Sequence, residues 1–337
     1  MKIKTLLTLL LLLITYSSAK YLYSVSTPEY KYGKLVTIID LSNGKTISNV
    51  FIGLKYQIVD ILSIDEASNT LLLFCSYILA NYLVSVDISS SNFTILSVVP
   101  NGYSYSYEFQ SFAWIEQQKI AFIPVLVGEF SLKTPISSMQ INFDSKSVSV
   151  TNYSLEGASN MILPLQWFDS LNEKVYLSYS TYDSNSGLFG TNMFSYNFSN
   201  LIGSAQTFQN IENVTSVTLI FTDSKSNVYL IKQDTIYNGF VDICKLDLLS
   251  KTCPTFYTHE IGSYSQYQFN PFIVSQDGST LLIISKDQSG SSFSDSSSSS
   301  GSYDLTFFKI NSNFQKSTLK IEDYWPNDQF FSNSFIF

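Results

Sequence analysis

The 337-residue chain contains no arginine and only one histidine, His259. Without arginine it lacks the guanidinium groups that read phosphates and guanine edges, and its formal net charge of −8 would repel a polyanion. A single histidine is also too few for a histidine-based zinc site and argues against a Ser-His-Asp triad. The composition therefore argues against nucleic acid as a partner. We expect His259, within Tyr257-Thr-His-Glu260, on the surface of an outer strand.

Long apolar runs are absent beyond the N-terminus, so the sequence predicts no membrane span. The run from Leu6 to Ile14 is too short to cross a bilayer, which takes ~20 residues. Basic residues precede this run, and the small residues Ser17 and Ala19 follow it. These features predict a signal peptide over residues 1–19, cleaved after Ala19. The mature chain would lose two lysines, carry a formal charge of −10 and be secreted.

Cysteine is scarce, with three residues in the whole chain. Cys244 and Cys253 lie in the two arms of one predicted hairpin, which in an oxidising compartment indicates a disulfide. Cys75 lies in the apolar run Leu71-Leu-Leu-Phe-Cys-Ser. We interpret it as a buried, unreactive thiol rather than a nucleophile.

Four Asn-X-Ser/Thr sequons accompany the predicted signal peptide and make the mature chain a candidate glycoprotein. All four fall within or beside predicted hairpins, which suggests that these hairpins lie on the outside of the fold. The acceptor residues are Asn92, Asn152, Asn197 and Asn213.

The abundant feature is alternation of Ile, Val, Leu, Tyr, Phe and Thr with polar residues, broken by Ser, Asn, Gly and Asp. No segment has a helical stripe over three turns, so the sequence predicts an all-β fold. One outline recurs six times: an apolar run that ends in Asp or Asn, a polar turn, and a second alternating run. The Asp/Asn markers stand 47, 55, 55, 50 and 64 residues apart, at Asp40, Asp87, Asn142, Asn197, Asp247 and Asn311.

Six units of four short strands predict a six-bladed β-propeller with four-stranded antiparallel blades over residues 20–337. The first unit has room for only three strands, over residues 21–26, 35–41 and 46–52. A spare strand over residues 329–337 could complete that blade and close the ring, which would hide sheet edges. Two β-sandwiches of roughly 150 residues each are the alternative arrangement.

The Val-x-Val-Asp-x-Ser outline of these hairpins, as in Val84-Ser-Val-Asp-Ile-Ser89, resembles the repeats of YVTN and quinoprotein-like β-propellers. The resemblance covers nearly the whole mature chain. It implies a fold and no particular activity.

In such a ring the tight turns emerge on one face, and the connections between second and third strands and between blades emerge on the other. The latter connections are long and rich in tyrosine, and one is a serine-rich insert over residues 287–304. Tyrosine suits sugar rings or a protein partner, so we expect a binding module for a glycan, matrix or protein partner. Alternatively, these tyrosines are ordinary residues packed between blades. The candidate binding residues are Tyr103, Tyr105, Tyr107, Tyr264, Tyr267 and Trp325.

Two further hypotheses stay open. Six-bladed propellers of the gluconolactonase and paraoxonase kind hold calcium in the central channel through Asp, Glu and Asn near the start of innermost strands. Asp60, Asn270 and Asn333 lie near that position here, and oxygen ligands suit calcium. A likeness to that kind implies a calcium-dependent lactonase or esterase, although turn capping would also explain these residues. The other hypothesis is a structural coat or matrix protein.

Overall fold

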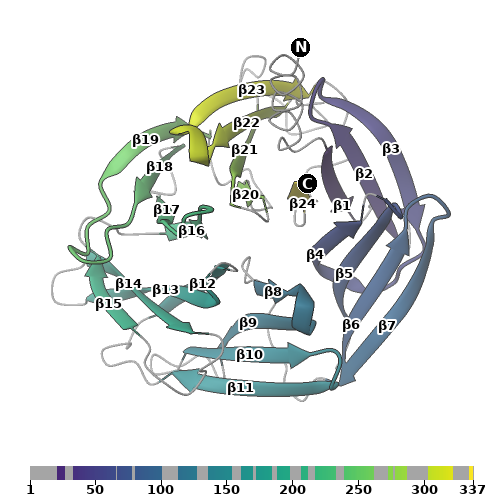
Figure 1. The fold of residues 1–337 in the computed structure, drawn as a ribbon, viewed down its shortest axis with the longest axis horizontal. Helices are drawn as coiled ribbons and strands as arrows, with labels where there is room; N and C mark the ends of the chain where they lie inside the picture. Colours follow the sequence, from purple (N-terminus) through teal and green to yellow (C-terminus); the bar gives the residue numbers. More distant parts are fainter. Residues whose placement is uncertain are drawn as a thin grey trace, which may run out of the picture.

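The strands form a ring of six four-stranded antiparallel sheets, a six-bladed β-propeller (Figure 1). The computed structural model describes residues 21–26, 33–65, 67–77, 80–100, 113–126, 136–153, 161–169, 172–183, 188–197, 206–211, 217–232, 239–261, 272–275, 278–286, 303–321 and 334–336. Within these ranges there is no α-helix, and two short 3-10 helices, η1 (Glu116–Gln118) and η4 (Ile310–Ser312), occupy turns. The prediction of an all-β, six-bladed propeller is therefore confirmed.

Each blade runs from an inner to an outer strand. Blade one consists of β24 (Ser334–Ile336), β1 (Tyr21–Ser26), β2 (Lys34–Asp40) and β3 (Lys45–Ile52), and blade two of β4 (Gln57–Asp65), β5 (Thr70–Tyr77), β6 (Ala80–Asp87) and β7 (Asn92–Pro100). Blade three consists of β8 (Ala113–Ile115), β9 (Ile120–Leu126), β10 (Ile136–Asn142) and β11 (Ser147–Tyr153), and blade four of β12 (Met161–Asp169), β13 (Lys174–Asp183), β14 (Leu188–Asn197) and β15 (Gln206–Ile211). Blade five consists of β16 (Val217–Thr222), β17 (Val228–Lys232), β18 (Phe240–Lys245) and β19 (Thr255–Glu260), and blade six of β20 (Phe272–Val274), β21 (Thr280–Lys286), β22 (Tyr303–Lys309) and β23 (Gln315–Ile321).

The C-terminal strand closes the ring, as predicted. β24 pairs antiparallel with β1, with Leu22 opposite Ile336 and Ser24 opposite Ser334. The two ends of the chain therefore share blade one. This pairing satisfies an edge of β1 that would otherwise be exposed.

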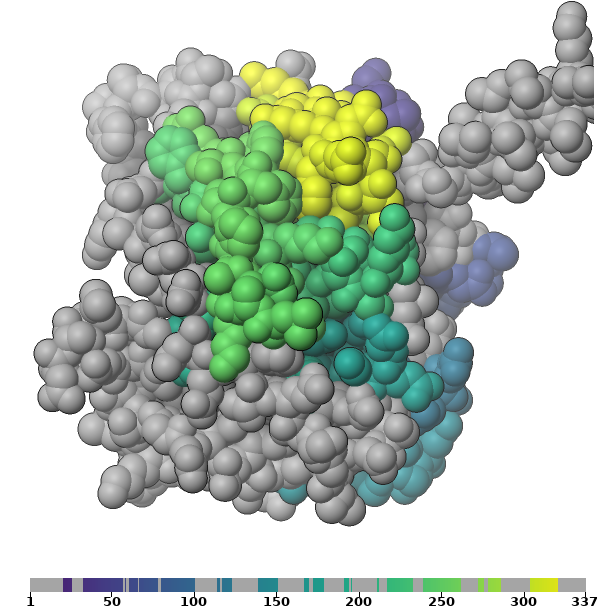
Figure 2. Space-filling view, turned by 60° about the vertical axis from the view of Figure 1, so that its left-hand side comes forward, coloured from purple at the N-terminus to yellow at the C-terminus, as the bar shows by residue number. Residues whose placement is uncertain are grey.

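The core lies between neighbouring blades rather than in a single centre. Because successive strand residues point to opposite sides, an inner strand that is apolar throughout packs against both neighbouring blades. In β5, Leu71 and Leu73 pack with blade one, whereas Phe74 packs with blade three. In β17, Ile231 packs toward blade six and Leu230 toward blade four. Figure 2 shows the resulting contact between blade five, in green, and blade six, in yellow.

The predicted disulfide is present between Cys244 of β18 and Cys253, with the two Cα atoms 5.3 Å apart. It joins the two arms of the hairpin between β18 and β19, beside a bridge between Asp247 and Thr252. Cys75 is fully buried in β5, as predicted.

Candidate functional site

The two faces of the ring differ in the connections that they carry. Connections between first and second strands emerge on the same face as connections between third and fourth strands, and those at residues 41–44 and 88–91 are tight turns. Because the strands are antiparallel, these turns share one face, which we call the tight-turn face. The opposite face, the long-connection face, carries the links between second and third strands and between blades. Long connections on a rigid scaffold are common binding sites.

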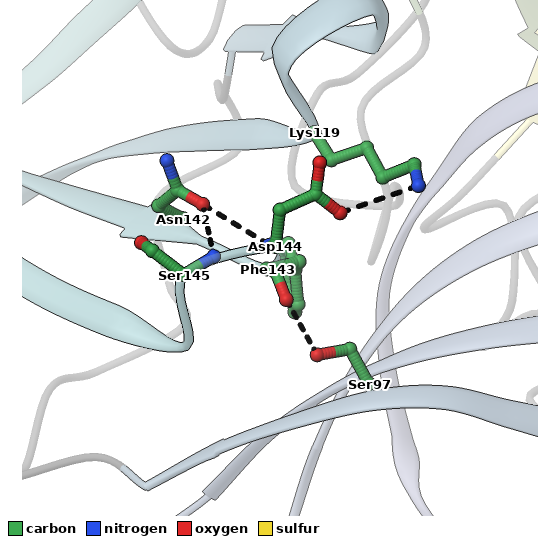
Figure 3. A network of polar contacts seen from close by, with 6 residues as sticks. All are labelled: Ser97, Lys119, Asn142, Phe143, Asp144 and Ser145. Carbon is green, nitrogen blue, oxygen red and sulfur yellow. Dashed lines mark hydrogen bonds and ion pairs between the residues drawn. The ribbon is translucent and has the colours of Figure 1, made fainter.

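The recurring Asp/Asn markers cap the turns of the tight-turn face. The side-chain oxygens of Asp40, Asp87, Asn142 and Asp247 accept hydrogen bonds from backbone N–H groups two or three residues later. Asp40 accepts from Ser42 at 2.7 Å, Asp87 from Ser89 at 2.8 Å, and Asp247 from Leu249 at 2.9 Å. Figure 3 shows the same arrangement at Asn142, whose oxygen accepts from the N–H groups of Asp144 and Ser145.

The turn-capping aspartates have a structural role, because their oxygens accept hydrogen bonds within their own turns. The hydrogen bonds that they accept, chiefly from the Ser42 hydroxyl for Asp40 and from the Ser90 hydroxyl for Asp87, hold their pKa below the ordinary value. They therefore stay ionised at neutral pH as acceptors in their own turns. The sixth marker differs, because the Asn311 side chain accepts a hydrogen bond at 3.1 Å from the hydroxyl of Ser224 in blade five. That contact ties the turns of blades five and six together.

Three tyrosines cluster on the long-connection face where blades one and two meet. Tyr56 precedes β4, Tyr77 ends β5, and Tyr82 lies near the start of β6. The rings of Tyr56 and Tyr82 stack with centroids 4.3 Å apart and planes 16° apart. Tyr77 meets Tyr56 edge-on at 5.8 Å and has 49% of its surface exposed. The cluster therefore offers an exposed aromatic ring supported by a half-buried stacked pair.

Lys34 adds a cation to the same end of the junction. It is the first residue of β2, at the end that faces the long connections, and its amine interacts electrostatically with Cys75, the residue opposite Tyr82 in the strand register. Burial lowers the pKa of the Lys34 amine and raises the pKa of the Cys75 thiol to about 12. The thiol is therefore protonated and unreactive at neutral pH.

Aromatic rings and hydroxyls can contact the apolar face of a sugar or a peptide side chain, and an amine at the same end of the junction can pair with an anionic group. We name this group, Lys34, Tyr56, Tyr77 and Tyr82, the tyrosine cluster. The sequence interpretation had pointed to tyrosines in the longer connectors and missed this group. The available signal was three tyrosines within or near two connections that are short for this face, residues 53–56 and 78–79.

The predicted binding residues lie outside the part of the chain that the structure describes, and so do Asn270 and Asn333. These binding residues are Tyr103, Tyr105, Tyr107, Tyr264, Tyr267 and Trp325. Asp60 is described by its backbone alone, on the innermost strand β4 opposite Phe74. Among the side chains that are described, no three His, Cys, Asp or Glu residues lie close enough to hold a metal ion. The predicted signal peptide lies outside the described residues, as does the serine-rich insert except Tyr303 and Asp304, which begin β22.

The placement of His259 corrects the sequence interpretation in part. It lies on β19, the outermost strand of blade five, as expected, but its side chain is only 8% exposed. The outer strand still has one side that packs against the next blade, and His259 shares that side with Tyr257. Its ring meets Phe308 of blade six edge-on at 5.8 Å. Burial, reinforced by Lys316, lowers its pKa to about 4.

Two of the sequons lie on outermost strands. Asn92 is exposed at the start of β7. Asn152 lies on β11, which is also an outermost strand, whereas Asn197 is the last residue of β14, the third strand of blade four. Asn213 lies outside the described residues. In the described part of the chain, no helix is both long and apolar enough to cross a membrane.

Comparison with known proteins supports the fold and leaves the family open. No family model matches the chain. An uncharacterized protein of Dictyostelium discoideum is 26% identical over 272 residues, which cover 79% of this chain and 73% of that protein.

Two solved structures share the fold at low sequence identity. TolB from Acinetobacter baumannii is similar over 90% of this chain, with 9% identity and a TM-score of 0.52. The matched region spans 64% of that TolB chain, which is less than two thirds of it. A chain from a nidogen/laminin complex is similar over 94% of this chain and 97% of its own length, with 9% identity and a TM-score of 0.51. At this identity the likeness shows the β-propeller fold alone.

Proposed function

We propose that this chain is a secreted glycoprotein that acts as a binding module for an extracellular glycan, matrix component or protein. The ligand contacts the long-connection face, and the tyrosine cluster is part of the contact surface. The observation that carries the proposal is the exposed Tyr77 ring braced by the stacked pair Tyr56 and Tyr82. Rigid aromatic side chains give a large contact area at a small entropic cost.

The fold is compatible with such a role. A chain of similar fold occurs in a nidogen/laminin complex, so a ring of this kind can form one side of a protein assembly. The predicted signal peptide and the four sequons support a location outside the cytosol. The low content of charged residues, 14%, leaves a surface on which aromatic and hydroxyl groups dominate recognition.

The test begins with the purified mature protein, screened against arrayed glycans and immobilised extracellular matrix proteins. For a ligand found in this way, Tyr77→Ala should weaken binding roughly 5-fold or more, because losing an aromatic contact costs ~1–3 kcal/mol. Leu249→Ala is the matched control. Leu249 is 96% exposed, but it lies in a turn on the opposite face, so its loss should leave binding unchanged. Equal affinity of the wild type and both variants would mean that the site lies elsewhere.

The calcium-dependent hydrolase makes a different prediction. Asp60 lies on β4, the innermost strand of blade two, and a channel ion would bind among the innermost strands (Figure 1). That hypothesis requires about one tightly held calcium per chain, measurable by elemental mass spectrometry, and loss of esterase activity in Asn270→Ala. A protein without calcium and without turnover, but with a ligand at Tyr77, would favour the binding module. A structural coat protein predicts neither calcium nor a ligand at Tyr77.

A further inference from the structure

The outermost strand of each blade has one hydrogen-bonding edge with no strand partner among the described residues. These six strands are β3, β7, β11, β15, β19 and β23, each at the end of its sheet. An unpaired edge is a template for pairing with another chain, and natural proteins protect such edges, often with a charged side chain. The charged residues and sequons on each outermost strand therefore indicate how its edge is protected.

Three of the six outermost strands carry a charged side chain that is exposed. β3 begins with Lys45, β19 ends with Glu260, and β23 contains Lys316 and Lys320. A second copy that paired with one of these edges would have to desolvate the charge. Those three blades are thus protected in the ordinary way.

The other three outermost strands carry no charged residue. They are β7 with the sequence NFTILSVVP, β11 with SVSVTNY, and β15 with QTFQNI. Each of them has a sequon on or beside it. Asn92 is the first residue of β7, Asn152 lies within β11, and Asn213 follows the end of β15 by two residues in the sequence.

On the strands themselves, β3, β19 and β23 have a charge and no sequon, whereas β7 and β11 have a sequon and no charge. Charged residues flank two of the three uncharged strands, Lys146 before β11 and Glu212 after β15, whereas β7 has neither a charge nor a charged neighbour in the sequence. The fourth sequon, Asn197, ends β14, the strand that pairs with the uncharged β15. We therefore ask whether a glycan, rather than a charge, protects the edge of blade two.

Blade two shows why its edge needs a cover. Four apolar side chains of β7 are exposed: Phe93 by 37%, Ile95 by 39%, Leu96 by 53% and Val98 by 38%. An apolar edge strand of this kind favours self-association. Asn92 and Thr94, the acceptor and the hydroxyl residue of the sequon, are also exposed and two residues apart, so they lie on one side of the strand.

We propose that an N-linked oligosaccharide on Asn92 covers the uncharged edge of blade two and keeps it from pairing with another copy. The inference rests on the secretion that is part of the proposed function, because the modification takes place in the secretory pathway.

The modification is a glycosyl transfer to the amide nitrogen of Asn92. The donor is an oligosaccharide linked to a lipid through a diphosphate. A bond forms between Nδ2 and the anomeric carbon of the first sugar, and the bond from that carbon to the diphosphate oxygen breaks. The lipid diphosphate leaves with the electron pair, and Nδ2 loses one proton.

The first measurement is the mass of the peptide between Lys55 and Lys119 from protein secreted by a eukaryotic host. This peptide contains one sequon, so its glycan reports Asn92 alone. We expect an attached glycan that peptide N-glycosidase removes, leaving aspartate at position 92. A secreted protein whose peptide is unmodified would overturn the inference and leave the binding function standing. A chain retained in the cytosol would instead contradict the secretion on which both rest.

The second measurement is the self-association of the folded protein by sedimentation velocity. The variant Asn92→Gln, which removes the glycan without adding a charge, should convert monomer to oligomer as concentration rises. Thr94→Ser retains the sequon and should stay glycosylated and monomeric. Adding Ile95→Lys to Asn92→Gln should restore the monomer, because a charge then replaces the glycan. Protein that lacks the Asn92 glycan and remains monomeric at every concentration would refute the protective role.

Discussion

Ser97, on the outermost strand of blade two, donates a hydrogen bond of 2.7 Å from its hydroxyl to the carbonyl oxygen of Phe143 in blade three (Figure 3). Both residues are buried, and 46 positions separate them in the sequence. The Phe143 ring packs edge-on against Phe74 of blade two at 5.8 Å. Apolar packing and a buried hydrogen bond thus join these two blades at one point.

Ser97→Ala should reduce the free energy of unfolding by about 1–2 kcal/mol, because it removes the donor and leaves a buried carbonyl without it. Urea denaturation followed by far-ultraviolet circular dichroism measures this change. Ser317→Ala is the control, since Ser317 is exposed on β23. A Ser97→Ala midpoint equal to that of the control would show that the bond adds nothing to stability.

Gly278→Ala should cost more, about 2–4 kcal/mol, in the same measurement. Gly278 has a φ of +65°, and a Cβ there would overlap the carbonyl oxygen of Thr222 in blade five. Alanine must therefore adopt a strained backbone and push two blades apart. Gly53→Ala is the matched control, because a Cβ added at Gly53 would meet no atom within 4 Å. If the two variants had equal stability, the contact between Gly278 and Thr222 would be unimportant.

The disulfide should contribute about 2.5 kcal/mol, since it closes a short loop with a sequence separation of 9. The double variant Cys244→Ala, Cys253→Ala should lose that amount under oxidising conditions. Reduction of the wild type should give the same loss. Cys75→Ala tests the third thiol, which is buried and outside the disulfide, and this variant should lose as much stability on reduction as the wild type does. Reduction that left the wild-type midpoint unchanged would contradict the assignment.

Local sequence signals predicted the architecture because the fold repeats a local unit. The Asp/Asn pattern is visible without long-range contacts because Asp40, Asp87, Asn142 and Asp247 each cap their own turn. The predicted strand over residues 35–41 corresponds to β2 (Lys34–Asp40), a shift of one residue. The closing strand could be predicted because the first unit lacked one strand and the last had one to spare.

The burial of His259, the Tyr56–Tyr82 stack and the bond between Ser224 and Asn311 depend on contacts between residues far apart in the sequence. An alternating pattern shows that residues face two sides but not which side a neighbouring blade covers, which is why His259 was expected at the surface. The stacking of Tyr56 on Tyr82 likewise joins a residue before β4 to one on β6, across the intervening strand β5. The bond between Ser224 and Asn311 joins residues 87 positions apart. Local sequence patterns therefore could not predict these contacts.

His259 should make the stability of the fold depend on pH between about 6.5 and 4. Its Nε2 atom is buried without a hydrogen-bond partner, and the positively charged Lys316 of blade six lies nearby. Because the pKa falls from 6.5 to about 4 on folding, the unfolded chain binds the proton more tightly than the folded one. The stabilisation from the neutral ring is therefore fully present above pH 6.5 and is lost as the pH falls toward 4, by about 2–3 kcal/mol.

The variant His259→Phe isolates this contribution from the other groups that titrate in the same range. Phenylalanine can pack against Tyr257 and Phe308 without a titrating atom, so the variant should lose less stability than the wild type between about pH 7 and pH 4.5. Removal of the unpaired Nε2 also predicts that the variant is at least as stable as the wild type at about pH 7. Urea denaturation at each pH gives both quantities. Parallel pH profiles for the two proteins would mean that His259 is not the group whose protonation opposes folding.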